Sequence, residues 1–224
     1  DHAILMLTLG FLLLVWSSDR FIVGVARVAT LLGLSRMVVG IVFVGFATAF
    51  PELLVSLFAS LDGHPKLALG NALGSYITNI GLVLGVSALV KPLKIHMRFL
   101  WQELPIMTLS LFLGLGLLAL GGDLTESDGF ILLLGFLAYT IYLVMAARSE
   151  SQDLKKDIIK SDVLHHEEMS LVMASFWLVL GLGLMLLSVT WITENAVLIA
   201  KYFGINDLVI GLTIVAIGTS LPEL

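Results

Sequence analysis

The sequence contains no cysteine and few charged residues. Without cysteine there is no disulfide framework, no thiolate nucleophile and no cysteine-based metal site. Asp, Glu, Lys and Arg make up 13% of the 224 residues, about half their share in a typical soluble domain. Hydrophobic residues make up 58%, and the mean hydropathy is +1.05. This composition predicts an all-α polytopic membrane protein whose surroundings are the lipid bilayer and not a nucleic acid.

Long apolar runs predict membrane-spanning helices, because about 20 apolar residues are needed to cross the hydrocarbon core. The first run is interrupted by Ser17, Ser18, Asp19 and Arg20. We expect one long, tilted or kinked helix there, with Asp19 and Arg20 turned toward the bundle as an intramembrane pair. The expected helices cover residues 4–32, 36–61, 67–90, 103–120, 129–147 and 171–203, and a seventh begins near Asp207.

The charged residues between the helices predict an orientation. Basic residues follow the third and fifth expected helices, whereas acidic residues follow the fourth. The basic residues are Lys91, Lys94, His96 and Arg98, then Lys155, Lys156 and Lys160, and the acidic ones are Asp123, Glu126 and Asp128. The positive-inside rule therefore places the basic segments in the cytoplasm and the N-terminus outside a cell membrane, either an inner or a plasma membrane.

Residues 40–53, GIVFVGFATAFPEL, place a proline and a glutamate near the middle of an apolar run. A carboxylate at this depth costs at least about 2–3 kcal/mol on insertion scales, so Glu52 is a candidate functional residue. The pattern recurs in residues 211–224, GLTIVAIGTSLPEL, where Glu223 follows Glu52 by 171 residues. The Pro-Glu pair stands at the same place in both segments, which indicates that residues 40–53 and 211–224 are related to each other.

Residues 7–53 align with residues 178–224 without a gap, which indicates internal duplication. The informative identities are Gly10/Gly181, Ser17/Ser188, Gly33/Gly204, Gly40/Gly211, Thr48/Thr219, Pro51/Pro222 and Glu52/Glu223. Five expected spans separate the starts of the two copies, and an odd number turns the second copy upside down. The sequence therefore predicts an inverted repeat of five transmembrane helices each.

The repeat predicts how the chain is divided. Residues 1–147 form the first half, residues 148–169 a cytoplasmic loop, and residues 170–224 the start of the second half. The loop contains His165, His166, Glu167 and Glu168, which lack the HExxH spacing of a zinc site, so we expect a solvated segment. Because Leu224 falls in the middle of an expected span, we also expect the second half to be truncated.

Inverted repeats build transporters whose site lies near the bilayer midplane, on helices that are interrupted there. Pro51 has no N–H for the carbonyl of Ala47, and Pro222 has none for that of Gly218. Freed carbonyls beside carboxylates and threonine hydroxyls are hard oxygen ligands. Such ligands suit Ca²⁺, and Na⁺ by the same logic.

The third expected helix carries further polar residues. Spacings of four put Asn71, Ser75 and Asn79 on one face, with Thr78 beside them. A ligand role and a role in hydrogen bonding between helices are both open for these side chains. The spacings of Gly70 with Gly74 and of Gly81 with Gly85 predict close helix packing.

The motifs GFATAFPEL and AIGTSLPEL, with GNALGSYITNIGLVLG after the first, resemble the alpha repeats of the cation/calcium exchanger superfamily. The likeness covers essentially the whole chain and is closest to bacterial and archaeal members of the sodium/calcium exchanger branch. It implies two sets of five membrane helices, central ion sites and exchange of Na⁺ against Ca²⁺ by alternating access. It also implies that the long first and sixth helices slide across the rest as a gate.

The resemblance implies a role for each matching position. Glu52 and Glu223 would be carboxylates that bind both Ca²⁺ and Na⁺, with help from Thr48 and Thr219. Flanking Na⁺ sites would be formed by Ser220, Ser75 and the carbonyls of Gly45 and Ala216. Asn79 would serve the central region. The expected carbonyl ligands thus move outward from Ala47 and Gly218 by two residues. Ca²⁺ and Na⁺ are the transported ions, and no cofactor is expected.

Three residues depart from the family pattern. Ala49 stands where the family has the serine seen here as Ser220, Ala47 replaces a glycine, and Tyr76 replaces an asparagine. These departures leave the coupling ion and the stoichiometry open, so an H⁺- or K⁺-coupled cation exchanger of the same fold is the alternative hypothesis.

Two other classes of protein are alternatives to an exchanger. An intramembrane enzyme is disfavoured, because the sequence has no cysteine, no GxSxG motif and no HExxH motif. A channel or a non-transporting sensor on the same fold stays open, and flux that requires a counter-ion gradient would distinguish an exchanger from either. The sequence does not indicate an oligomeric state.

Overall fold

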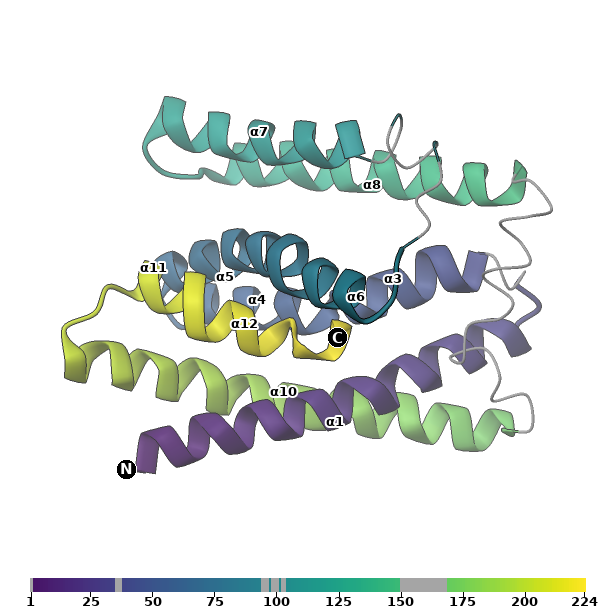
Figure 1. The fold of residues 1–224 in the computed structure, drawn as a ribbon, viewed down its shortest axis with the longest axis horizontal. Coiled ribbons are helices and arrows are strands. Elements are labelled where there is room, and N and C mark those ends of the chain that lie inside the picture. Colours follow the sequence, from purple (N-terminus) through teal and green to yellow (C-terminus); the bar gives the residue numbers. More distant parts are fainter. Residues whose placement is uncertain (1, 35–37, 94–96, 98–100, 102–103, 150–168) are drawn as a thin grey trace. The chain divides into compact units, whose positions relative to one another are not determined.

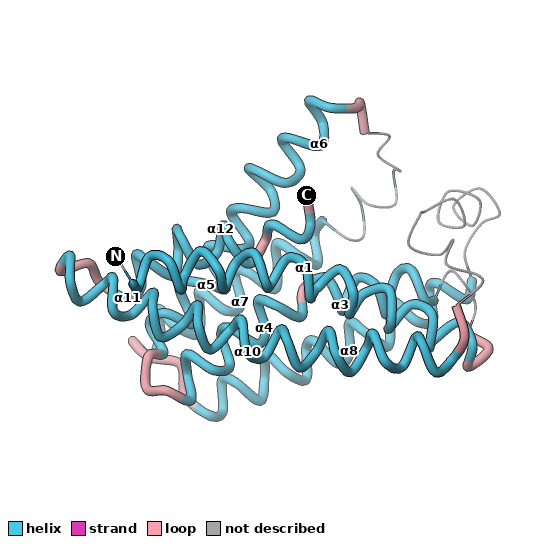
Figure 2. Tube along the Cα trace, turned by 90° about the horizontal axis from the view of Figure 1, so that it is seen from below, coloured by secondary structure: helices cyan, strands magenta, loops and turns pink. Residues whose placement is uncertain are grey.

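A computed structural model describes residues 2–34, 38–93, 97, 101, 104–149 and 169–224. These residues are almost entirely helical, and none of them forms a strand (Figures 1 and 2). They fall into two units, one from Asp1–Val90 and Ser151–Leu224 and the other from Lys91–Glu150. Lys94, His96, Arg98, Lys155, Lys156, Lys160 and the cluster from His165 to Glu168 lie outside the described residues.

The first unit contains parts of both expected copies of the repeat. From the first copy it has α1 (His2–Leu31), the π-helical η1 (Val39–Val44), α3 (Gly45–Thr48), α4 (Phe50–Leu61), α5 (Pro65–Thr78), the π-helical η2 (Asn79–Val83) and α6 (Leu84–Val90). From the second copy it has α10 (Leu171–Phe203), α11 (Asp207–Ile210), the π-helical η5 (Gly211–Val215), α12 (Ala216–Thr219) and the 3₁₀ turn η6 (Leu221–Glu223).

The described helices match the expected spans. Five stretches are long and apolar enough to cross a membrane, namely His2–Leu31, Pro65–Val90, Leu104–Gly121, Glu126–Met145 and Leu171–Phe203. Val42–Thr48 and Phe50–Leu61 meet at a bend of 48° and would make a sixth span together. The prediction of one long first helix is confirmed, and the interruption of the second falls within its Pro-Glu motif.

The two longest helices, α1 and α10, pack against each other in opposite directions (Figure 1). Gly10 near the start of α1 lies against Ile192 late in α10, whereas Gly24 lies against Leu178 early in α10. A Cβ atom at Gly24 would stand only 2.6 Å from the backbone nitrogen of Leu178. Glycine thus lets the helix backbones touch, as small residues do in membrane bundles.

A second contact joins α5 of the first copy to α11, η5 and α12 of the second (Figures 1 and 2). A Cβ at Gly74 would lie 2.6 Å from the Leu212 carbonyl, and one at Gly211 would lie 2.5 Å from that of Leu67. The close packing expected at Gly70 and Gly74 is therefore confirmed. At Gly81 and Gly85 it is not seen, because a Cβ atom at either position would have no described atom within 4 Å other than those of the neighbouring helical turns.

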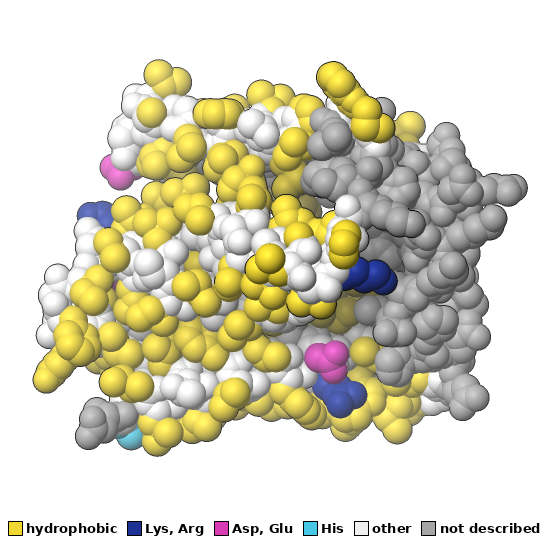
Figure 3. All heavy atoms as spheres, viewed as in Figure 1, with side chains coloured by type: hydrophobic (Ala, Val, Ile, Leu, Met, Phe, Trp, Pro, Cys, Tyr) yellow, Lys and Arg dark blue, Asp and Glu magenta, His cyan; other side chains and the backbone are white. Residues whose placement is uncertain are grey.

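Asp19 and Arg20 do not turn into the bundle of described helices, so that expectation was wrong. The Asp19 side chain is 66% exposed and that of Arg20 is 39% exposed, with 3.8 Å between the Asp19 carboxylate and the Arg20 Nε. An acidic and a basic side chain lie together over α1 on a largely hydrophobic face in Figure 3. The Arg20 guanidinium instead packs on the rings of Trp16 and Trp177, which attract it through cation–π interactions.

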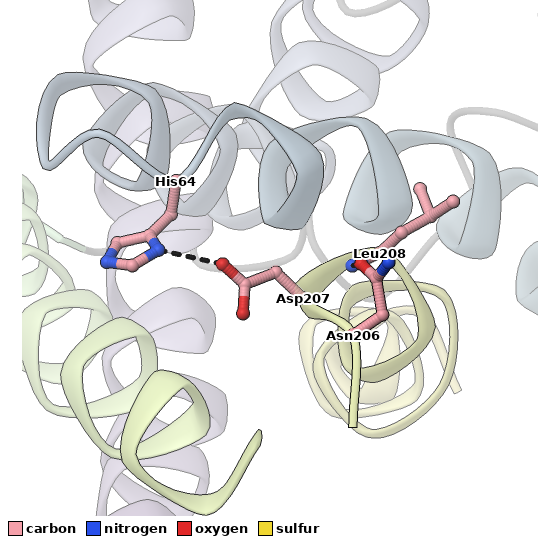
Figure 4. Close-up of polar contacts among 4 residues, drawn as sticks. All are labelled: His64, Asn206, Asp207 and Leu208. Atoms are coloured by element: carbon pink, nitrogen blue, oxygen red, sulfur yellow. Dashed lines mark hydrogen bonds and ion pairs between the residues drawn. The ribbon is translucent and has the colours of Figure 1, made fainter. Parts of the chain in front are cut away.

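One polar contact joins the turn after α4 to the start of α11 (Figure 4). Nδ1 of His64 lies 2.8 Å from a carboxylate oxygen of Asp207, and both side chains are about one quarter exposed. Asn206 precedes Asp207 and accepts the Leu208 N–H with its side chain, which caps α11. The two copies are therefore tied together at this end of the first unit.

The second unit consists of α7 (Leu104–Gly121) and α8 (Glu126–Ser149). Thr125 precedes α8, and its N–H and hydroxyl both donate to the Asp128 carboxylate, which fixes the start of the helix. Glu126 and Asp128 therefore belong to the first turn of α8 and not to a free acidic turn. Acidic residues are favourable there because the helix dipole is positive at its N-terminus.

Candidate functional site

The two Pro-Glu motifs adopt the same succession of backbone conformations. In the first copy, η1 leads into α3, which ends at Thr48, and in the second, η5 leads into α12, which ends at Thr219, 171 residues later. Ala49 (φ −80°, ψ 0°) and Ser220 (φ −86°, ψ 4°) then interrupt the helices near the sparsely populated bridge region. The interruption expected at both motifs is thus observed.

Each proline comes just after its break. Pro51 lies in the first turn of α4 and Pro222 in that of η6, where a missing N–H is tolerated. The residue before each proline, Phe50 or Leu221, already belongs to the new helical turn, so each break falls two residues before the proline. The motif therefore ends one helix and starts another inside a single apolar run.

The restarted helices carry the two carboxylates. Glu52 lies in the first turn of α4 and Glu223 in that of η6. Free N–H groups at a helix start favour negative charge. One carboxylate oxygen of each glutamate is buried and has no hydrogen-bond partner among the described residues.

One hydrogen bond links the second motif to the carboxylate of the first. The Ser220 hydroxyl lies 3.1 Å from Oε1 of Glu52 and donates to it. By the offset of the repeat, the position that corresponds to Ser220 is Ala49, which has no hydroxyl. The two carboxylates therefore have unequal surroundings.

Asn71 of α5 holds the two motifs together. Its Nδ2 donates to the Glu52 carbonyl at 3.1 Å and to the Ser56 hydroxyl at 3.0 Å. Its Oδ1 accepts from the Thr219 hydroxyl at 3.2 Å, and the whole residue is 0% exposed. Asn71 thus hydrogen-bonds between helices in the way that the sequence left open. Helical spacing identified the residue, but not its partner 148 positions away.

The carbonyls of Gly45 and Ala216 have matching contacts. The Thr48 hydroxyl lies 3.0 Å from the Gly45 carbonyl, and that of Thr219 lies 3.2 Å from the Ala216 carbonyl. Each carbonyl oxygen has a second lone pair that could bind a cation.

The remaining candidates come from α5 and η2. The Ser75 hydroxyl lies 3.5 Å from that of Thr219, at the limit of a hydrogen bond. Oδ1 of Asn79 is buried and has no partner among the described residues. The structure therefore gathers Glu52, Glu223, Thr219, Ser220 and Ser75, pairs Thr48 with Gly45, and leaves an unpartnered oxygen on Asn79.

The site offers oxygen ligands of several kinds. No group of three His, Cys, Asp or Glu residues suited to a metal ion occurs in the described part of the chain. A cation here would instead meet two carboxylates together with hydroxyl, amide and carbonyl oxygens. This donor set is suited to hard cations such as Ca²⁺ and Na⁺, and the unpartnered oxygens of Glu52, Glu223 and Asn79 fit that chemistry.

Comparison with known proteins identifies the family. The family described as Sodium/calcium exchanger protein matches residues 2–145 and 173–224. The chain belongs to the sodium/calcium exchanger family. It is therefore a multi-pass membrane protein in a family of exchangers and antiporters, which are transporters and not enzymes. The recognition made from the paired motifs is confirmed.

Individual relatives agree with this assignment. The putative antiporter CaxA of Alkalimonas amylolytica is 39% identical over 99% of this chain and 69% of its own length. The inner membrane protein YrbG of Escherichia coli is 36% identical over 98% of this chain and 67% of its own. Among sodium/calcium exchangers of solved structure, NCX_Mj soaked with Na⁺ and Sr²⁺ has a TM-score of 0.61 at 32% identity, covering 99% of this chain and 70% of that one.

Proposed function

We propose that this chain carries the ion-binding centre of a secondary active antiporter that exchanges Na⁺ against Ca²⁺ by alternating access. The observation that carries the proposal is the hydrogen bond from Ser220 of the second motif to the Glu52 carboxylate of the first, which joins the two motifs that carry Glu52 and Glu223. Each brings a buried carboxylate oxygen that has no partner among the described residues. Two such oxygens are ready ligands for one shared cation.

The proposed ligands are the residues named by the sequence, in the roles assigned there. They are the side chains of Glu52, Glu223, Thr48, Thr219, Ser220, Ser75 and Asn79 and the carbonyls of Gly45 and Ala216. The opposite directions of α1 and α10 support an inverted repeat with five spans in each half. On this reading residues 1–147 are the first half and residues 170–224 begin the second, with the N-terminus outside an inner or plasma membrane.

Electrostatics explains why such a centre would exchange ions. Two ionised carboxylates in a buried site repel each other, and enclosing them without a cation costs free energy. A bound cation removes the repulsion, so the loaded site closes to water more easily than the empty one. If only loaded sites cross between the two sides, one cation can leave only when another replaces it.

A second candidate differs in the coupling ion. Ala49 removes one hydroxyl from the first motif, which alters a part of the site where the resemblance implies Na⁺ binding. An H⁺- or K⁺-coupled exchanger of the same fold would be compatible with this loss. The chemistry of Ca²⁺ binding by the two carboxylates would be the same in either exchanger.

The test is calcium flux in proteoliposomes that contain the full-length protein. Outward gradients of Na⁺, K⁺ and H⁺ are imposed one at a time, and uptake of radioactive Ca²⁺ is measured. We expect the Na⁺ gradient alone to drive uptake. Uptake driven only by K⁺ or H⁺ would support the second candidate, whereas equal uptake without any counter-ion gradient would contradict antiport and indicate a channel.

A further inference from the structure

Helix α1 carries a buried hydroxyl that the proposed site does not use. Ser18 is 0% exposed, and its Oγ has no hydrogen-bond partner among the described residues. Leaving a buried hydroxyl unpaired costs free energy. The adjacent Ser17 is equally buried, but its hydroxyl donates to the Leu14 carbonyl at 3.1 Å. Ser18 is therefore the residue whose burial needs an explanation.

The direction of Ser18 follows from helical geometry. Seven residues of an α-helix turn through about 700°, which is about 20° short of two full turns. Ser18 therefore points in nearly the same direction as Phe11. The Phe11 ring lies against Gly218 of α12, where a Cβ atom would collide with it. Ser18 thus lies on the face of α1 that covers the second Pro-Glu motif.

Helix α1 also packs against η6, the turn that carries Glu223. The chain reverses between α10 and α11, so α11, α12 and η6 run parallel to α1, which packs against both α12 and η6. Ser18 lies about 10 Å beyond Phe11 along α1, and Glu223 lies beyond Gly218 in the same direction, after the break at Ser220. The C-terminal end lies beside the middle of α1 in both Figure 1 and Figure 2.

The two copies treat their carboxylates differently. Glu52 receives a hydrogen bond from Ser220, but the matching position for Glu223 is Ala49. The position in α10 that matches Ser18 is Val189, a buried residue of the hydrophobic core. Glu52 would therefore have the hydroxyl of Ser220, and Glu223 would have that of Ser18. Each hydroxyl lies outside the motif that carries the carboxylate, and the two come from positions that do not match in the repeat.

We propose that Ser18 supplies, from α1, an oxygen ligand for a monovalent cation held by Glu223, in the place that Ala49 leaves without a hydroxyl. The proposal rests on the proposed function, because it takes Glu223 to be a cation ligand. One carboxylate balances the charge of one Na⁺, and a neutral hydroxyl completes its shell without adding charge. Occupancy of this site would then depend on where α1 lies.

Two variants and a rescue test the proposal in the full-length protein. Ser18→Ala removes the hydroxyl, and Ser17→Ala is the matched control, since that serine is equally buried on the same helix but points toward α10. Ala49→Ser in the Ser18→Ala background restores a hydroxyl at the position that matches Ser220. Melting temperatures without added ions show whether each variant folds.

The first readout is the Na⁺ concentration that gives half-maximal Na⁺-driven Ca²⁺ uptake. We expect Ser18→Ala to raise it about five-fold, as loss of one hydrogen-bond-strength contact would, with a change in half-saturating Ca²⁺ below about two-fold. Ser17→Ala should change neither value, and Ala49→Ser should recover most of the loss. If Ser18→Ala behaves like Ser17→Ala, the proposal is overturned.

The second readout does not depend on transport and separates this proposal from the proposed function. The rise in Tm on adding NaCl, and separately CaCl₂, is measured against choline chloride on the purified protein. Loss of the Na⁺-induced rise in Ser18→Ala, with the Ca²⁺-induced rise kept, would support the proposal even if wild-type vesicles show no exchange. Equal rises in Ser18→Ala and wild type, or no Na⁺-induced rise in wild type, would contradict it.

Discussion

The two Pro-Glu motifs have nearly the same backbone but different side chains. Both run from π-helical turns into a single α-helical turn, break at one residue and restart one residue before a proline. At the break, however, one copy has Ala49 and the other Ser220, and two residues earlier one has Ala47 and the other Gly218. The proline and the small residues thus preserve the path of the chain, while the oxygen ligands differ between the two copies.

The largest expected effect comes from the feature that the copies share. We expect Glu52→Gln and Glu223→Gln each to lower Na⁺-driven Ca²⁺ uptake by at least about 100-fold, because loss of even an outer-shell partner costs metal sites about 10–100-fold. Glu194→Gln on the exposed side of α10 is the control and should transport normally. Full uptake by Glu52→Gln would remove that residue from the site.

Asn71 is the next point at which to test the link between the copies. Asn71→Leu removes the hydrogen bonds of Asn71 to the Glu52 carbonyl, to Ser56 and to Thr219, so we expect a loss of about 2–4 kcal/mol in the free energy of unfolding. Asn195→Leu is the control, because that buried asparagine makes one described bond, to the Trp191 carbonyl of its own helix. Chemical denaturation in detergent measures both, and similar losses would show that Asn71 has no special linking role.

The size difference between Gly218 and Ala47 offers a third test. Gly218→Ala would collide with the Phe11 ring, so we expect a destabilisation of about 1–3 kcal/mol. The position that matches Phe11 is Leu182, and Phe11→Leu should therefore recover most of the stability of Gly218→Ala. Thermal melting of both single variants and the double variant measures the coupling. Additive losses would mean that this pair does not compensate in size.

The smallest expected effect lies at the turn that ties the copies together. His64→Gln or Asp207→Asn should each lower stability by about 0.5–1 kcal/mol, because the pair is partly solvated. A double-mutant cycle with both changes isolates the contact between His64 and Asp207. A coupling energy of zero would show that this contact does not stabilise the packing of the two copies.

Much of the fold could be predicted because its signals are local. The apolar run of residues 171–203 became α10 with the same bounds, and the prolines marked both breaks. Gly33 and Gly204, matched in the repeat, both adopt positive φ just after the ends of α1 and α10. Such features depend on a few neighbouring residues, so a single sequence carries them.

The rest depends on distant partners. Nothing near Asn71 in the sequence indicates that it bonds to Thr219, and nothing near Arg20 indicates that Trp177 of another helix covers it. The π-helical turns before each break were also missed, because they add no residue type that a propensity could detect. The paired carboxylates were found because duplication places them at equal positions, which makes a long-range relation visible in the sequence.

The close packing of α1 on α10 has a mechanical consequence. The backbone of Leu178 lies against Gly24, and that of Phe21 lies against Gly181, so the two helix backbones are in direct contact at two neighbouring points. Arg20 packs on Trp16 of α1 and on Trp177 of α10, and so links the two helices near these contacts. A force that pushes one helix along its axis is therefore transmitted to the other. The two helices behave as one rigid unit that lies over the carboxylates of Glu52 and Glu223.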